Sequence, residues 1–71
     1  MSPGIEYVVF DQLTMNQLGE FATFEEAEEC FFRFVGPHPP AAEHILIWRN
    51  DGKDIVRVEV DPEKIRRLTA A

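Results

Sequence analysis

The residues of this chain that could carry chemistry begin with its one cysteine, Cys30. A nucleophilic thiol needs a lowered pKa, which a helix N-terminus or a neighbouring cation supplies. Cys30 falls past the middle of a helix expected over residues 24–35, on the apolar side, and the sequence offers it neither feature. We therefore expect Cys30 to be a small buried core residue, as free cysteines commonly are.

The two histidines, His38 and His44, are six residues apart with a proline pair between them. This matches no metal-ligand spacing, and no second cysteine is available to complete a zinc site. The sequence also lacks a glycine-rich phosphate loop and the common catalytic motifs. We expect no metal and no cofactor.

Paired carboxylates occur as Glu25-Glu26 and Glu28-Glu29 on the expected helix. General acid–base chemistry would require one of them to lie in an apolar cleft that raises its pKa. A charged helix face is instead typical of a surface in contact with water. The chain is also short for a substrate pocket, so we predict that the protein is not an enzyme.

Charge and length restrict the function further. The chain has 71 residues and a net charge of -6, and residues 1–32 contain acids but no Lys or Arg. Nucleic-acid affinity depends on Lys and Arg displacing counterions, so this balance argues against phosphate-backbone binding as the main activity. The first residues form no signal peptide and no apolar run could span a membrane, so we expect a cytoplasmic protein without a membrane partner.

Helices and strands must position these side chains, and the sequence predicts them in the order ββαββα. This order indicates one α+β domain over residues 1–71. A four-stranded, mainly antiparallel sheet would carry one helix on one face, as a two-layer sandwich, with a short C-terminal helix. Thr23 and Glu26 form a capping box that starts the central helix, and Gly36 should end it in a left-handed cap. The expected strands are 5–10, 17–22, 44–49 and 54–60, and the Asp51-Gly52 pair predicts a hairpin turn between the last two. The expected helices are 24–35 and 62–68, and 37–40 is an extended connector.

The periodicity of the central helix divides its side chains into two faces. At 100° per residue one stripe is apolar and faces the sheet, the opposite stripe is charged, and Phe32 falls between them. The expected core stripe contains Phe24, Ala27, Cys30, Phe31, Phe34 and Val35.

Alternation along the strands predicts that a second apolar surface lies on the sheet face away from this helix. It would be bordered by Glu6, His44, Arg57 and Glu59, and it is too apolar to remain exposed. Either the C-terminal helix covers it through Ile65 and Leu68, or another protein chain does. The residues assigned to this face are Val8, Phe10, Leu46, Trp48 and Ile55.

The loop between the first two strands carries two large apolar side chains, Leu13 and Met15. Hairpin tips are usually polar, so either one of these side chains tucks under the sheet edge or the loop is a binding element. We expect the first.

These patterns predict a small acidic, non-catalytic protein-interaction or regulatory module that self-associates through its sheet as a homodimer. The alternative is a nucleic-acid-binding module that stacks bases on Phe10 and Trp48; a third possibility is that the acidic half mimics nucleic acid. Bases available to the alternative are Arg49, Lys53, Arg57, Arg66 and Arg67. Expected protein-interface residues are Phe10, Leu46, Trp48 and Ile55 on the sheet, and Glu25, Glu28, Glu29 and Phe32 on the helix.

Overall fold

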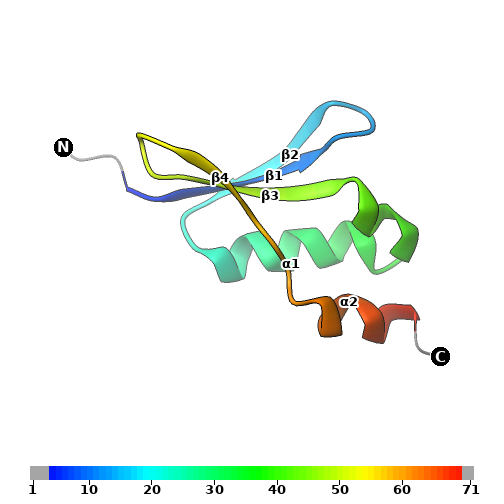
Figure 1. The fold of residues 1–71 in the computed structure, drawn as a ribbon. Coiled ribbons are helices and arrows are strands. Elements are labelled where there is room, and N and C mark those ends of the chain that lie inside the picture. Colours follow the sequence, from blue (N-terminus) through cyan, green and yellow to red (C-terminus); the bar gives the residue numbers. More distant parts are fainter. Residues whose placement is uncertain (1–3, 70–71) are drawn as a thin grey trace.

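The fold is an α+β sandwich in which one antiparallel sheet carries both helices on the same side (Figure 1). The structure, a computed structural model, describes residues 4–69. The predicted fold class and the order ββαββα are confirmed. The elements are β1 (Glu6–Asp11), β2 (Asn16–Phe21), α1 (Phe24–Val35), the short 3-10 helix η1 (Pro39–Glu43), β3 (Ile45–Asn50), β4 (Ile55–Val58) and α2 (Pro62–Thr69).

The strand order in the sheet is β2-β1-β3-β4, with every neighbouring pair antiparallel. β1 and β3 are the interior strands, which explains why both carry apolar residues on both faces. A bulge in the β1–β2 pairing, between Val9 and Phe10, leaves Leu18 without a direct partner, and Leu18 packs against the core.

The core lies between the sheet and α1. Val9 and Ile47 contribute from the interior strands, and Ala27, Phe31 and Val35 contribute from the helix. Removing these side chains from water is the main stabilising term for so small a domain, at roughly 25 cal/mol per Å² of apolar surface.

The start of α1 is fixed by Thr23, whose backbone is extended and whose Oγ1 accepts a hydrogen bond from the Glu26 amide at 3.2 Å. The predicted capping residue is therefore confirmed. The Glu26 carboxylate accepts from the Thr23 hydroxyl at 3.1 Å, instead of from the Thr23 amide that the capping-box prediction implied.

Replacing Thr23 by alanine should lower the free energy of unfolding by about 1 kcal/mol, because one helix amide loses its acceptor. The melting midpoint should then fall by roughly 4–8 °C in a thermal scan. Thr23→Ser is the matched control, since it keeps the hydroxyl and should stay within a few tenths of a kcal/mol of the wild type. Equal losses in both variants would show that the hydroxyl does not cap the helix.

The end of α1 differs from the prediction. Gly36 has φ -53° and ψ -50°, a right-handed conformation, and its N–H donates to the Phe32 carbonyl at 2.8 Å. The prediction of a left-handed cap was wrong. The backbone keeps its right-handed conformation after α1 and leads into η1, which buries Ala41 against the core. The connector is also shorter than expected, since Pro39 already opens η1, where a missing N–H costs little.

Phe34 is a second departure. It was expected on the core stripe, but it is 44% exposed, whereas Phe31 is 3% exposed. Figure 1 shows the β1–β2 hairpin bending away from the C-terminal end of α1, so the last turn has less sheet above it than a flat layer would provide.

The position of α2 answers whether the C-terminal helix covers the outer face of the sheet. Ile65 and Leu68 pack against the core cluster, and α2 lies beside α1 on the helix side of the sheet (Figure 1). Lys64 Nζ donates to Glu28 Oε1 of α1 at 2.8 Å, which ties the two helices together. The possibility that α2 covers the outer face of the sheet is therefore wrong.

Candidate functional site on the outer sheet face

The side of the sheet away from both helices carries the apolar surface that strand alternation predicted. We call it the outer face and define it by Val8, Phe10, Leu46, Trp48 and Ile55. Directly paired residues of antiparallel strands project to the same side. The register pairs Val8 with Trp48 and Phe10 with Leu46, so these four side chains share one face.

The centre of the outer face is a shallow cavity of about 310 Å³ lined by Val8, Phe10, Trp48, Asn50 and Ile55. Ile55 is 65% exposed, and Val8, Phe10 and Trp48 are half-buried. An isoleucine and two aromatic rings around one depression form a contiguous apolar patch of the kind that marks interaction surfaces.

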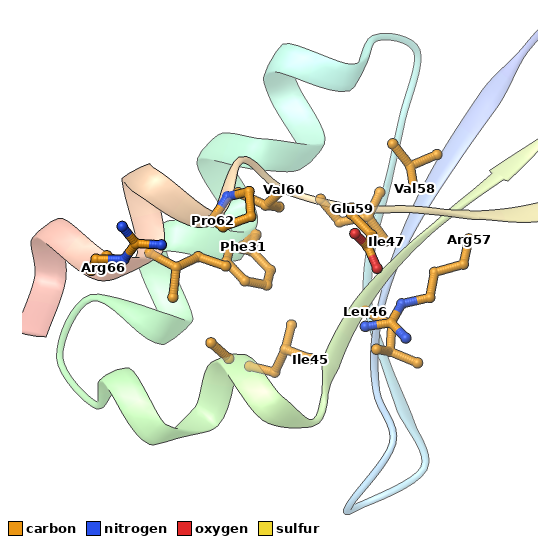
Figure 2. A pocket seen from close by; sticks show the side chains of 12 residues that line it. Phe31, Ile45, Leu46, Ile47, Arg57, Val58, Glu59, Val60, Pro62 and Arg66 are labelled. Carbon is orange, nitrogen blue, oxygen red and sulfur yellow. The ribbon is translucent and has the colours of Figure 1, made fainter.

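Leu46 differs from the other members of the face. Its side chain is only 8% exposed, so neighbouring side chains cover it and it offers little surface to a partner. Figure 2 shows the Arg57 side chain beside it. The alkyl part of an arginine covers apolar surface while its charge stays in water.

His44 does not border the outer face as predicted. Its Nδ1 lies 3.1 Å from Asp11 Oδ1 at the end of the sheet, and the same oxygen accepts from the Leu13 amide at 2.9 Å. Desolvation alone would raise the pKa of Asp11, but hydrogen bonds from Leu13, His44 and Thr14 outweigh it and hold that pKa below its ordinary value. His44 therefore anchors the β1–β2 loop.

That loop ends in two exposed apolar side chains. Leu13 and Met15 are both largely in solvent, so the expectation that one tucks under the sheet edge was wrong. Met15 has φ 61°, a left-handed conformation that is uncommon for a residue with a side chain. The short turn after Asp11 imposes this geometry and directs the tip outward.

The acidic helix surface is largely engaged within the protein. Glu28 pairs with Lys64 of α2, and Glu29 Oε1 lies 3.7 Å from Arg33 Nη2 on the same helix. Phe32 packs against the core cluster, with its ring 5.2 Å from that of Phe31 in an edge-to-face arrangement. Glu25 is exposed. This surface therefore has less free charge and less open aromatic area than the sequence indicated.

Cys30 lies in the core, as predicted. Burial raises the pKa of its thiol, and the positive charge of Arg33 on the next turn of the helix lowers that pKa by less. The direction of the net shift is opposite to the one a nucleophile requires. Within the described range 4–69, no group of three His, Cys, Asp or Glu side chains could hold a metal ion.

A second cavity, of about 410 Å³, opens where β4 leaves β3 and the chain crosses to α2 (Figure 2). Its walls are core side chains that include Phe31, Ile45 and Ile65, and Arg57 and Arg66 lie at opposite ends of it. Arg66 Nη1 pairs with Glu63 at 2.8 Å. The rim also carries Glu59, so its charges do not converge on one ligand group.

The charges that border the outer face have an ordered distribution. Glu20 on β2 pairs in register with Val8, and Arg57 on β4 pairs in register with Trp48. The acid and the base thus lie at the two edges of the face, on either side of its apolar centre. Glu20 was not among the residues predicted for this face. Its position depends on the register of the β1–β2 hairpin, and the bulge shifts that register by one residue relative to simple alternation.

The bases required by the nucleic-acid alternative do not gather around Trp48. Arg57 lies next to it, but Arg66 and Arg67 belong to α2, in the other layer. Arg49 pairs with Tyr7, which packs against the core, so Arg49 projects from the helix side. The acids on β1 and β2 would repel phosphates from the same face.

Comparison of the chain with protein-family models, with curated proteins and with solved structures found no match. No helix in the described part of the chain has the length and apolar character needed to cross a bilayer.

Proposed function

We propose that this protein is a small, non-catalytic protein-interaction module that acts by associating with a second copy of itself through the outer face. The observation that carries the proposal is that neither helix covers this apolar face. A regulatory or adaptor role suits a domain whose cysteine is buried in the core and whose His44 and Glu28 side chains make structural contacts.

A second copy is the occupant because the face is complementary to itself. It joins an apolar centre to an acidic edge on β2 and a basic edge on β4. A self-complementary patch is what a two-fold symmetric dimer needs. A partner carrying only one sign of charge would match one edge and be repelled by the other.

Trp48 is the residue we place near the centre of the interface. It lies on an interior strand and lines the central depression together with Val8 and Phe10. Tryptophan is enriched among residues that dominate binding energy, because its large stiff ring excludes much water at a small entropic cost.

Replacing Trp48 by glutamate should abolish self-association, because a carboxylate at the centre of the patch would lose its hydration without gaining a partner. Sedimentation equilibrium from about 1 µM to about 500 µM spans the affinities at which a small interface forms. The apparent mass of the wild type should rise toward twice the chain mass, and that of Trp48→Glu should remain at one chain.

The matched control is Phe34→Glu, which places the same charge on an exposed aromatic position in the helix layer. Phe34→Glu should associate like the wild type. A wild-type mass of one chain across the whole range contradicts the proposal, and so does equal dissociation in both variants.

A further inference from the structure

The pairing register arranges four outer-face side chains in one row across the sheet. Glu20 of β2 is opposite Val8 of β1, Val8 is opposite Trp48 of β3, and Trp48 is opposite Arg57 of β4. Because directly opposite residues lie at the same height along the strands, the row runs straight from an acid to a base.

Both ends of this row lack an opposite charge. Among residues 4–69, neither Glu20 nor Arg57 has an ion-pair partner within 4.0 Å. Glu20 instead accepts a hydrogen bond from Gln17 Nε2 at 2.7 Å. It also approaches Glu6, and the hydrogen bond and negative charge of Glu20 raise the pKa of Glu6. Glu20 on β2 and Glu6 on the adjacent strand β1 are thus two crowded carboxylates, and a nearby cation would reduce their repulsion.

From this row we infer the geometry of the dimer: two copies stack outer face to outer face about a two-fold axis parallel to the strands, so that Glu20 of each copy meets Arg57 of the partner subunit. The inference rests on the proposed function. The axis passes between β1 and β3, the two interior strands.

The direction of the axis follows from symmetry and charge. A two-fold rotation about an axis along the strands reverses the strand order and preserves height, so β2 lies over β4 and Val8 lies over Trp48 of the partner subunit. A rotation about the other in-plane axis would place β2 over β2 and bring the acids of both copies together. Like charges at an interface are unfavourable, so the first axis is selected. It also keeps the strands of the two sheets nearly aligned, as in packed sheets about 10 Å apart.

The size of the face sets the strength of the dimer. Strands of up to six residues at about 3.3 Å per residue, spaced about 4.8 Å apart, give a flat area of roughly 400 Å² per copy. Standard interfaces bury about 800 Å² per partner, so we expect a weak, reversible dimer with a dissociation constant in the micromolar range.

The test uses two charge reversals, Glu20→Lys and Arg57→Glu, measured by sedimentation equilibrium. In a homodimer of either variant, both contacts become like-charge pairs, and self-association should weaken at least about tenfold. In an equimolar mixture, the two variants supply each other with opposite charges at both contacts. The mixture should associate about as strongly as the wild type, and the double variant should associate with itself.

The controls separate association from folding. Glu25→Lys and Arg67→Glu make the same charge changes in the helix layer and should associate like the wild type. Circular dichroism checks the fold of each variant. Glu20→Lys places a cation beside Glu6, which favours the folded chain, so loss of association in that variant would not reflect unfolding.

The outcomes distinguish this geometry from the proposed function. A monomeric wild type overturns both. A wild-type dimer that is lost in Trp48→Glu but unaffected by the single charge reversals overturns only the geometry. Weakened single variants that do not recover on mixing also overturn it, because opposite charges at positions 20 and 57 of the facing copies would then fail to restore association. About the other in-plane axis each of these positions would face its own counterpart, so a single reversal would leave like charges, as in the wild type, and would not weaken association.

Discussion

Replacing Ile47 by alanine should remove about 2–5 kcal/mol from the free energy of unfolding, because the deleted groups leave a cavity in the tightest part of the core. Ile47 is 1% exposed, lies on interior strand β3 and pairs with Val9 on one side and Val58 on the other. At about 0.05–0.15 kcal/mol per residue, a domain of this length has only about 4–10 kcal/mol of stability. Much of the variant should therefore be unfolded in mild urea.

The matched control is Ile55→Ala, which removes the same groups from a side chain that is 65% exposed on the outer face. Its stability should lie within about 0.5 kcal/mol of the wild type. Urea titration followed by the fluorescence of Trp48, at about 1 µM so that the weak dimer is dissociated, measures both variants. Equal losses in the two variants would contradict the assignment of the two sheet faces.

Phe31 and Phe34 form the second informative comparison, since they occupy neighbouring turns of one helix face but differ in burial. Phe31→Ala should cost about 3–5 kcal/mol, because Phe31 is buried between the sheet and the C-terminal part of the chain. Phe34→Ala should cost less than about 1 kcal/mol, because the ring is already partly in water.

The same urea titration measures this pair, with the helical circular dichroism signal as a second probe. A larger loss at Phe34 than at Phe31 would show that α1 is rotated relative to the sheet. That result would contradict the packing described above, in which Phe31 is buried and Phe34 is partly exposed. Equal losses would instead favour the stripe expected from periodicity alone, which places both rings in the core.

The helix start at Thr23 and the turn at Asp51-Gly52 could be predicted because the determining contacts are local. Glu26 donates to a side chain three residues earlier, and Asp51 Oδ1 accepts from the Lys53 and Asp54 amides at 2.8 Å. Those bonds also hold the pKa of Asp51 below its ordinary value. Gly52 has φ 93°, a conformation that glycine adopts without strain.

The membership of the outer face could also be predicted, since strand alternation has a period of two whatever the neighbours are. Alternation assigned Val8, Phe10, Trp48 and Ile55 to the side away from the helix, and the lining of the central depression confirms it. Alternation gives the side of a residue but not its exposure. For that reason the burial of Leu46 beneath neighbouring side chains was not foreseen.

The sequence by itself therefore determined the elements, their order and the two faces of the sheet, because capping, turn chemistry and periodicity act over a few residues. Only the tertiary structure decided which residues meet across long separations, such as His44 with Asp11 and Lys64 with Glu28. It also decided that Glu20 and Arg57 lie at the two opposite ends of one row across the sheet. These contacts depend on strand register, on the bulge in β2 and on where α2 packs. Strand register, the bulge and the position of α2 all depend on how side chains from the whole chain pack in the core. No short stretch of sequence contains that information.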